Sequence, residues 1–216
     1  MIAGLIGGIV WQTADKISVG GKESLGVIMY PDERLRQIAE PVDNVQLEKE
    51  QITELFELMR NTAAKMDAVG IAAPQVGVPE RIIMVRTSTS VSLADSEYLG
   101  MVNPEIIERD GTSTAIDGCL SLPRGDWKTE VTRSETVTVG YLTSDGLEET
   151  VTTSGRVARE IQHEIDHLDG ILAIDYAKPH HFNRKLVSAA GIYLVALVAA
   201  IVWYVTNRIR SRRRTC

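Results

Sequence analysis

The sequence has little cysteine for its length of 216 residues. Its two cysteines, Cys119 and Cys216, lie far apart, and the second is the last residue of the chain. Two widely separated cysteines exclude a small domain that is held together by a framework of disulfides. We therefore expect a reducing compartment, in which Cys119 is free for metal or redox chemistry.

Basic residues are scarce outside the end of the chain. The formal net charge is −6, although residues 208–216 form a basic tail with five arginines and no acid. Without these five arginines, 18 basic residues stand against 29 acidic ones, so the rest of the chain carries −11. An acidic body argues against direct DNA binding.

Charge is absent altogether from Leu186 to Asn207, a run of 22 residues. As a helix this run would be roughly 33 Å long, which is enough to cross the hydrocarbon core of a bilayer. Trp203 and Tyr204 lie near one end, where aromatic side chains meet the membrane interface. We predict a transmembrane helix over 186–207, and a buried core helix is the alternative.

The first residues lack the features of a targeting peptide. The apolar segment 1–11 is too short to span a bilayer and has no basic leader, and the first arginine is Arg34. These properties argue against both a signal peptide and a transit peptide. The sequence instead predicts an apolar N-terminal extension and linker over residues 1–24, of which 18–24 is the linker, followed by a folded domain over 25–180.

The folded domain contains the patterns of both helices and strands. Apolar residues recur at helical spacing over 46–66, which predicts an amphipathic helix, and Gly155 opens a second helix. Over 25–41 we expect a strand, a turn at Pro31-Asp32 and a short helical turn. Further strands are expected at 81–85, at 98–102 and, as a hairpin, at 136–142 and 147–154.

These elements predict an α+β fold class. Small β-sheets are expected to pack around the second helix, which is then central to the domain. The transmembrane helix over 186–207 is an addition at the C-terminal side of this domain, and the basic tail over 208–216 follows it.

The central helix carries the pattern H-E-x-x-H as His163, Glu164 and His167. Residues i and i+4 lie on one face of a helix, so both imidazoles can reach one metal ion. Glu164 lies beside them, where it can handle a proton. Because a catalytic metal usually has three protein ligands and one open position, a third ligand is needed.

The usual downstream partners of this motif are missing. An extended form of the motif needs histidine at position 173, where the chain has Ala173, and no glutamate follows Glu164. The weaker downstream alternatives are Asp169, Asp175, His180 and His181.

Upstream of the motif there is no histidine, which leaves the carboxylates and Cys119. Cys119 lies in the stretch D-G-C-L-S-L-P, where a glycine lets the backbone approach a ligand closely. We favour Cys119 as the third ligand, because a thiolate and two imidazoles make a site with one vacancy. The alternative is that Cys119 is a buried residue with only a packing role.

Three blocks of residues resemble the motifs of the peptide deformylase family, in the family's order. With φ for an apolar residue, the family's G-φ-G-φ-A-A-P-Q resembles residues 68–75, E-G-C-φ-S resembles 117–121, and Q-H-E-φ-D-H-L resembles 162–168. The early P-D-E-R-L-R-Q-I-A-E-P-V also looks like the family's N-terminal segment. The resemblance implies that residues 25–180 form a deformylase-like catalytic domain.

The chain departs from the family pattern at two positions. Ala68 replaces the first glycine of the first block, and Asp117 replaces the glutamate of the second block. In the family pattern this acid pairs with an arginine, for which Arg133 is the matching candidate. Aspartate is one methylene shorter, so we expect a looser pairing or a shifted loop. Neither change removes a metal ligand or the catalytic acid.

The resemblance implies that the chain removes the formyl group from N-formylmethionyl peptides. It assigns Cys119, His163 and His167 to a metal, which is Fe²⁺ in the family, with Zn²⁺, Ni²⁺ or Co²⁺ able to replace it. A metal ion at such a site makes a water molecule acidic enough to act as the nucleophile near neutral pH. Glu164 is implied as the group that takes the water's proton and returns it to the leaving amine.

The same resemblance assigns groups that bind the substrate and the oxyanion. The side-chain amide of Gln75 and the backbone N–H of Leu120 are implied as donors to the oxyanion. Val69 would face the methionine pocket. Gly70 and Gly118 would let the backbone lie beside the extended peptide.

The expected partners are the N-formylmethionyl peptide, the ribosome with its nascent chain, and the membrane, which is bound through the C-terminal helix. We expect a monomer that is anchored in the membrane, with its catalytic domain on the cytoplasmic side. Two rival hypotheses are a membrane-anchored H-E-x-x-H metalloprotease and an inactive homologue that binds peptide termini. The blocks A-A-P-Q and G-C-L-S argue against the protease, and the departures at Ala68 and Asp117 are the only support for the inactive homologue.

Overall fold

A computed structural model describes residues 16–19, 22–46, 48–87, 97–123 and 129–177 of the chain. These residues belong to a unit that spans Met1–Ala177, and a second unit spans Lys178–Cys216. Within the described residues, no helix has both the length and the apolar character needed to cross a bilayer. The predicted transmembrane helix over 186–207 and the predicted extension over 1–15 lie outside the described residues.

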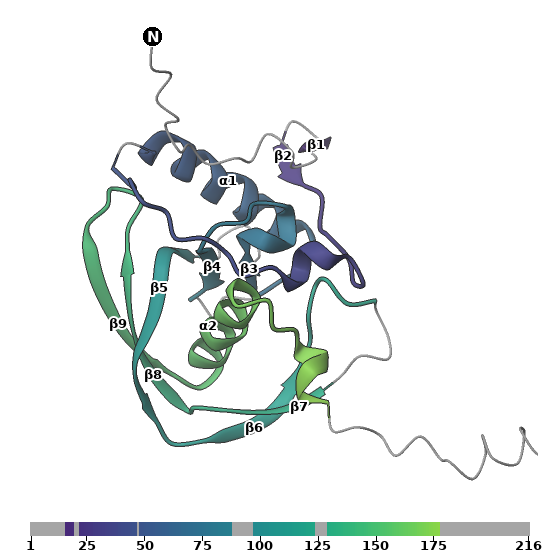
Figure 1. Ribbon diagram of the computed structural model, residues 1–216, viewed down its shortest axis with the longest axis vertical. Helices are drawn as coiled ribbons and strands as arrows, with labels where there is room; N and C mark the ends of the chain where they lie inside the picture. The colour runs from purple at the N-terminus through teal and green to yellow at the C-terminus, as the bar shows by residue number, and fades with distance from the viewer. Residues whose placement is uncertain (1–15, 20–21, 47, 88–96, 124–128, 178–216) are drawn as a thin grey trace, which may run out of the picture. The chain divides into compact units, whose positions relative to one another are not determined.

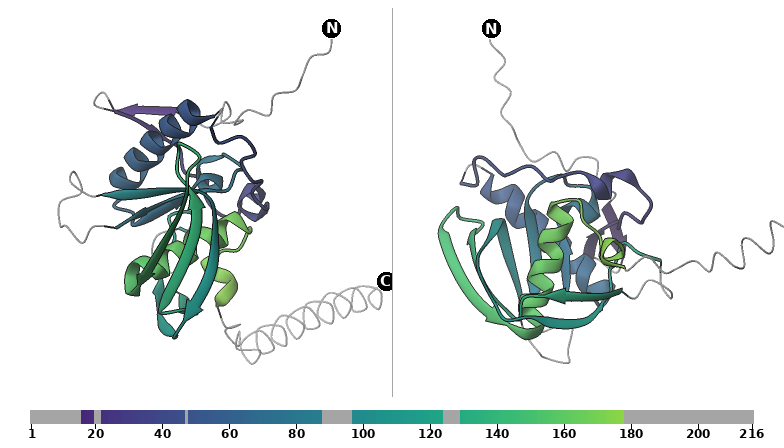
Figure 2. Two further views of the ribbon diagram at one scale, coloured as in Figure 1. Left: turned by 90° about the vertical axis from the view of Figure 1, so that its left-hand side faces the viewer. Right: turned by 60° about the horizontal axis from the view of Figure 1, so that its bottom comes forward.

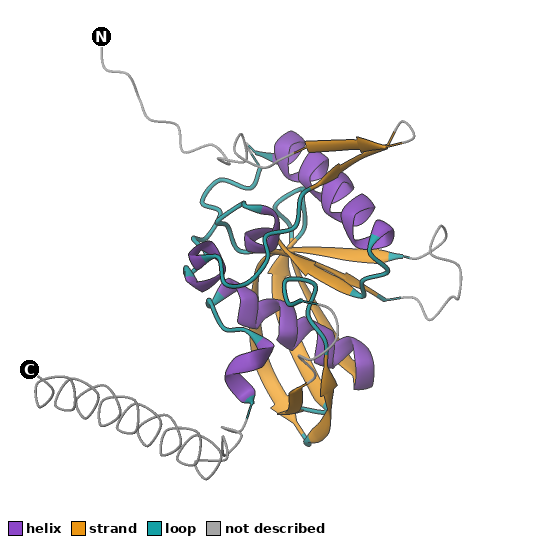
Figure 3. Ribbon diagram, turned by 90° about the vertical axis from the view of Figure 1, so that its right-hand side faces the viewer, coloured by secondary structure: helices purple, strands orange, loops and turns teal. Residues whose placement is uncertain are grey.

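The first unit is built on a five-stranded sheet in which every neighbouring pair is antiparallel (Figures 1 and 3). The strand order is β3-β4-β5-β8-β9. The strands are β3 (Gly70–Ala72), β4 (Ile82–Arg86), β5 (Tyr98–Asp110), β8 (Thr136–Leu142) and β9 (Glu148–Ser154). Two separate hairpins pair β1 (Lys16–Val19) with β2 (Lys22–Leu25) and β6 (Ser113–Asp117) with β7 (Thr129–Arg133).

Two α-helices cover opposite faces of this sheet around β4. Ile82 and Met84 pack in one cluster with α1 (Lys49–Lys65), whereas Ile83 and Val85 pack in another cluster with α2 (Gly155–Leu168). Because side chains alternate between the faces of a strand, a strand that is covered on both sides needs an unbroken apolar run. The sequence I-I-M-V meets that need.

Helix α2 lies within the curve of β5, β8 and β9 (Figures 1 and 2). Its apolar residues, among them Ile161, Ile165 and Leu168, pack against Val137 and Val139 of β8. The helix begins at Gly155, whose φ of +62° is a conformation that suits glycine. Within the described residues, three short 3₁₀ helices complete the fold: η1 (Glu33–Arg36), η2 (Ala73–Val76) and η4 (Ala173–Tyr176).

Most of the predicted elements are confirmed. The helix predicted over 46–66 is α1, and the predicted strands at 81–85 and 98–102 are β4 and the first part of β5. The predicted hairpin is β8 and β9, and Gly155 does open α2. The described residues therefore form a mixed α+β fold, as expected.

Two predictions near the N-terminus were wrong. Residues 26–30 do not form a strand, because their backbone bonds to two separate segments: Ile28 N donates to the carbonyl of Gln75 in η2, and Tyr30 N donates to the Ser121 carbonyl. Within the predicted linker at 18–24, the described residues belong to the hairpin of β1 and β2. The β6–β7 hairpin was not predicted at all. Strand β6 is mostly exposed, and although burial alternates along β7, two of its three buried residues are polar, so the sequence shows no apolar alternation.

Candidate active site

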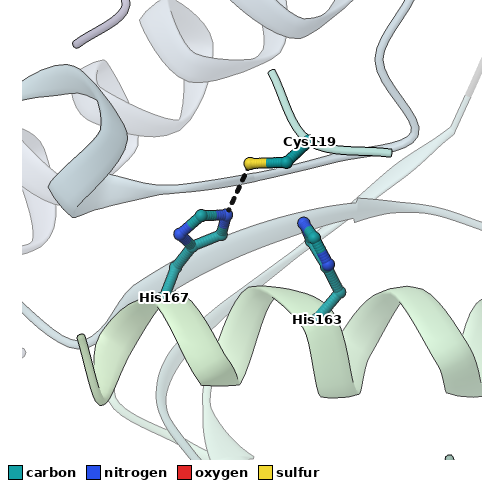
Figure 4. A group of neighbouring side chains, drawn as sticks. All are labelled: Cys119, His163 and His167. Atoms are coloured by element: carbon teal, nitrogen blue, oxygen red, sulfur yellow. Dashed lines mark hydrogen bonds between the residues drawn. The ribbon is translucent and has the colours of Figure 1, made fainter. Parts of the chain in front are cut away.

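Helix α2 brings the H-E-x-x-H residues together on one buried face. The side chains of His163, Glu164 and His167 are 5%, 3% and 1% exposed. The two imidazole rings lie 5.0 Å apart between centroids and are nearly perpendicular, at 85° (Figure 4). Both rings project from the helix toward the segment that carries Cys119 (Figure 4).

Cys119 lies two residues after the end of β6 and completes a compact group with the two histidines. Its Sγ lies 3.2 Å from Nε2 of His167, and the three potential ligand atoms all lie within 4.8 Å of one another. Ligand atoms around a tetrahedral transition metal are about 3.5 Å apart, given metal–ligand distances of 2.0–2.3 Å. Among the described residues this is the one such group of three or more.

The surroundings of the imidazoles fit a divalent ion at these three residues. Nδ1 of His163 faces Oδ2 of Asp117 at 3.6 Å, which leaves Nε2 available as a ligand. Burial is the main reason that the pKa of His167 lies well below its usual value, so this ring is neutral and keeps a lone pair. The sequence-predicted ligands are therefore brought together with suitable chemistry.

Asp117 is held by two arginines. Nε of Arg133 donates to Oδ2 of Asp117 over 3.0 Å, so the pairing expected from the family pattern is confirmed. Nε of Arg159 donates to the other oxygen, Oδ1, over 2.6 Å. Burial alone would raise the pKa of Asp117, but its polar contact with His163 and the charge of Arg133 lower it to about 2. Asp117 is thus a carboxylate at neutral pH and can orient His163.

Asp166, within the same motif, has a structural role and is not part of the metal-binding group. Its Oδ2 lies 2.8 Å from Nη1 of Arg133 and accepts a hydrogen bond from the Tyr176 hydroxyl over 3.0 Å.

The downstream alternatives Asp169 and Asp175 pair with Arg81 and Arg36. None of these three acids joins Cys119 and the two histidines.

Glu164 points toward Gly70 on the neighbouring strand β3. A Cβ on residue 70 would lie 2.3 Å from Oε1 of Glu164, so the absence of a side chain at Gly70 makes room for the carboxyl. Oε2 of Glu164 is buried and has no hydrogen-bond partner among the described residues. Burial, which outweighs the opposing charge of His163, raises the pKa of Glu164 to about 8.

The side-chain amide of Gln75 is fixed in one orientation. Its Oε1 accepts a hydrogen bond from the Ala72 N–H over 2.8 Å, which turns Nε2 toward the site. Nε2 lies 3.2 Å from the Ser121 hydroxyl and 3.8 Å from Cys119 Sγ. Gln75 is 1% exposed, so its donor is positioned before any substrate arrives.

One cavity of about 320 Å³ joins these groups. Eight of the nine predicted site residues line it, and the ninth, His167, contacts Cys119. Val69 and Gly70 come from the β3 side, and Gly118 and Leu120 flank Cys119. A Cβ at Gly118 would meet nothing within 4 Å, so this glycine leaves open space. The arrangement suits metal-assisted hydrolysis of a small group that enters from an open cavity.

The chain also matches a known family. A family model described as polypeptide deformylase matches residues 24–183. The chain belongs to the peptide deformylase family. It is therefore a hydrolase that removes the N-formyl group from nascent peptides.

The peptide deformylase of Pseudoalteromonas translucida is 40% identical over 170 residues, which cover 77% of this chain and 96% of that protein. That of Thermodesulfovibrio yellowstonii is 39% identical over 155 residues, which cover 72% and 90%.

Solved peptide deformylase structures share the fold. The class I type b enzyme from Acinetobacter baumannii, with Met-Ala-Ser bound, superimposes with a TM-score of 0.65 at 35% identity, covering 74% of this chain and 99% of that one. The Thermotoga maritima enzyme gives a TM-score of 0.64 at 34% identity, covering 72% and 99%. The deformylase fold thus accounts for most of the described residues.

Three residues at the deformylase site were not predicted from the sequence: Arg159, Glu160 and Ser121. Arg159 and Glu160 precede His163 and Glu164 by four residues, so helical periodicity could have pointed to both. The contact between Ser121 and Gln75 joins residues that are 46 apart in sequence, and no local pattern predicts it.

Proposed function

We propose that the chain hydrolyses the formyl amide of N-formylmethionyl peptides at Cys119, His163, His167 and Glu164. The observation that carries this proposal is the convergence of the three ligand atoms within 4.8 Å, beside a buried glutamate and in one cavity. The downstream acids Asp169 and Asp175 do not support the metalloprotease hypothesis, because their side chains pair with arginines.

Cys119, His163 and His167 would hold a divalent ion. Such an ion supplies Lewis acidity, which acidifies a water molecule and polarises the formyl oxygen. We propose Fe²⁺, as in the family that the sequence resembles, with Zn²⁺, Ni²⁺ or Co²⁺ able to occupy the same ligands. A ferrous site with a thiolate ligand is oxygen-sensitive, so the protein should be prepared anaerobically.

Glu164 moves the proton in the proposed reaction. As the water oxygen bonds to the formyl carbon, Glu164 accepts the water's proton. It then gives the proton to the amide nitrogen while the C–N bond breaks, which releases formate and a free amine. The unpartnered Oε2 and the pKa of about 8 support this role, because a carboxyl that titrates near neutral pH can both take and return a proton.

Two donors would stabilise the oxyanion on the former formyl group. The first is Nε2 of Gln75, whose orientation is set by the hydrogen bond from Ala72 N to Oε1. The second is the backbone N–H of Leu120, which lies next to Cys119 and lines the same cavity. Loss of one such donor typically costs about 10²–10³ in rate.

The substrate would lie along the cavity between β3 and the Cys119 loop. Val69 would contact the methionine side chain, and Gly70 and Gly118 would let the peptide backbone approach. Support comes from the open space at Gly118 and from the Met-Ala-Ser peptide that is bound to the Acinetobacter baumannii enzyme.

The first test is formate release from formyl-Met-Ala-Ser, with unblocked Met-Ala-Ser as the matched control. We expect stoichiometric formate from the formylated peptide and no peptide-bond cleavage in either. Cleavage between residues of the unblocked peptide would favour the metalloprotease. Tight binding without turnover by protein that contains one metal per chain would favour the inactive homologue.

We also propose that residues 186–207 anchor the enzyme in a membrane, with the catalytic domain on the cytoplasmic side, near ribosomes and their nascent chains. The support is the uncharged run of 22 residues with Trp203 and Tyr204 near its end. Protease accessibility in inverted and right-side-out vesicles tests the orientation. Digestion of the body only from outside would contradict it.

A further inference from the structure

The active-site cavity contains a carboxyl group that the proposed mechanism does not use. Glu160 lines this cavity together with His163 and Glu164. It precedes His163 by three residues and Glu164 by four on α2, so all three lie on the same face of this helix. Glu160 is therefore in the same space as the reacting groups.

No side chain among the described residues neutralises Glu160 directly. It has no hydrogen bond and no ion pair within this part of the chain, whereas Asp117, only 5% exposed, has both. The charged groups that act on it are His163 and Arg156 on its own helix, and Asp117 and Arg133 beside the helix. Burial is the largest influence and raises the pKa of Glu160. A partly buried carboxyl without a partner gains from any ligand that brings a donor to it.

The wall of the cavity that Glu160 lines is mixed: it includes polar residues, such as Asp67 and Gln75, and five apolar ones. Met66, Ala68, Val69, Leu120 and Leu122 all line it. Apolar walls suit an unbranched hydrocarbon stem, and a carboxyl suits a cationic or hydrogen-bonding group at the end of that stem. Methionine supplies the stem, but its thioether sulfur is not a donor.

We propose that Glu160 is a specificity-determining residue that extends this enzyme's activity to N-formyl peptides whose first side chain ends in a cation or another hydrogen-bond donor. A formyl-lysyl peptide represents this class of substrate. The inference rests on the proposed function, since the formyl group must be held at Cys119, His163 and His167 for the first side chain to reach Glu160. Sites that hydrogen-bond a substrate group discriminate strongly against an analogue that lacks it.

The test compares kcat/KM for formyl-lysyl, formyl-norleucyl and formyl-methionyl peptides that share the remaining residues. The enzymes are the wild type, Glu160→Leu and Glu160→Gln, each with its metal content measured. Glu130→Gln is the matched control, because it removes one acid from an exposed position on β7.

In Glu160→Leu we expect the ratio of formyl-lysyl to formyl-norleucyl kcat/KM to fall on the order of tenfold or more, chiefly through KM. Glu160→Gln should be intermediate, and Glu130→Gln should keep the wild-type ratio. An unchanged ratio in Glu160→Leu, or an equal fall in the Glu130→Gln control, would overturn the assignment. Wild-type turnover of the formyl-methionyl peptide reports separately on the proposed function, so the failure of one proposal can be told from the failure of the other.

Discussion

Nε of Arg159 donates to Oδ1 of Asp117 over 2.6 Å, and this contact ties helix α2 to the strand that leads into Cys119. Nη2 of Arg159 also donates to the carbonyls of Ala115 and Val131, so one side chain spans both strands of the β6–β7 hairpin. The two histidines and the cysteine come from these two parts of the fold. Arg159 therefore fixes their relative placement.

These contacts of Arg159 explain how the chain accommodates Asp117, where the family pattern has glutamate. With one methylene fewer, Asp117 remains 3.6 Å from Nδ1 of His163, which is longer than a good hydrogen bond. Arg133 holds one carboxylate oxygen and Arg159 holds the other. The carboxylate is thus prevented from rotating away from the imidazole that it orients.

Replacement of Arg159 with leucine should weaken metal binding about 10–100-fold, the range typical for loss of groups that orient metal ligands. Arg156→Leu, an exposed position on the same helix, is the matched control. Competition with a chelator of known affinity measures the effect, and the absorption of the Co²⁺-loaded protein reports on the thiolate ligand. Equal metal affinity of the Arg159→Leu and Arg156→Leu variants would contradict the role of Arg159 in placing the metal ligands.

Gly70→Ala should impair catalysis while leaving the metal in place. The added Cβ would lie 2.3 Å from Oε1 and 2.9 Å from Cγ of Glu164, so the carboxyl must move. We expect kcat to fall on the order of 10²-fold, as when a general acid–base group is misplaced. In the control Gly140→Ala the new Cβ has its nearest neighbour at 3.9 Å, which is an ordinary contact.

A double variant sharpens the interpretation of Gly70→Ala. Aspartate at position 164 withdraws the carboxyl from the space that the alanine would fill. Adding Gly70→Ala to Glu164→Asp should therefore cost much less than adding it to the wild type. Additive losses would show that Gly70 acts by a route other than its contact with Glu164.

Glu80 should make stability depend on pH. Its Oε2 is buried without a hydrogen-bond partner among the described residues, and burial together with the charge of Glu48 raises its pKa to about 7, from 4.5. The folded protein thus binds this proton more tightly than the unfolded chain does. The stabilisation is fully present below the unfolded pKa and is lost as the pH rises through the folded pKa.

Glu80→Gln should remove this loss. The difference in the free energy of unfolding between the variant and wild type should shift by about 1 kcal/mol in favour of the variant from roughly pH 5 to pH 8. This value is smaller than the pKa shift alone would give, because solvent screens a partly exposed group. Urea unfolding at the two pH values measures it, with the exposed Glu105→Gln as control. If the variant and wild type differ in the free energy of unfolding by the same amount at both pH values, Glu80 is not the source of the pH dependence.

The sequence predicted those elements whose patterns are local. Helix α1 and the hairpin of β8 and β9 follow from periodicity and turn residues, and α2 from its glycine start and the spacing of His163 and His167. Cys119 could be predicted as the third ligand because the H-E-x-x-H motif lacks a downstream partner and because three blocks resemble one family. In each case the information lay within a short stretch of residues or in an ordered set of motifs.

The parts that were not predicted depend on tertiary contacts. Residues 26–30 look like a strand, yet their backbone bonds to Gln75 and Ser121 in two other segments. Arg159 meets Asp117 across 42 residues, and the contact is set by how α2 packs on the β6–β7 hairpin. Such polar contacts between distant segments follow from packing. Helical periodicity places Arg159 on the face of α2 that carries His163, but it does not identify Asp117 as its partner.

The most direct test of the account is formate release by Glu164→Gln and wild type at equal metal content. Both proteins are prepared anaerobically and assayed with formyl-Met-Ala-Ser. Glutamine keeps the shape of Glu164 but cannot shuttle a proton, so we predict one metal per chain in both and a kcat at least about 10²-fold lower in the variant. Equal turnover at equal metal content would contradict the assignment of Glu164 as the proton shuttle beside Cys119, His163 and His167.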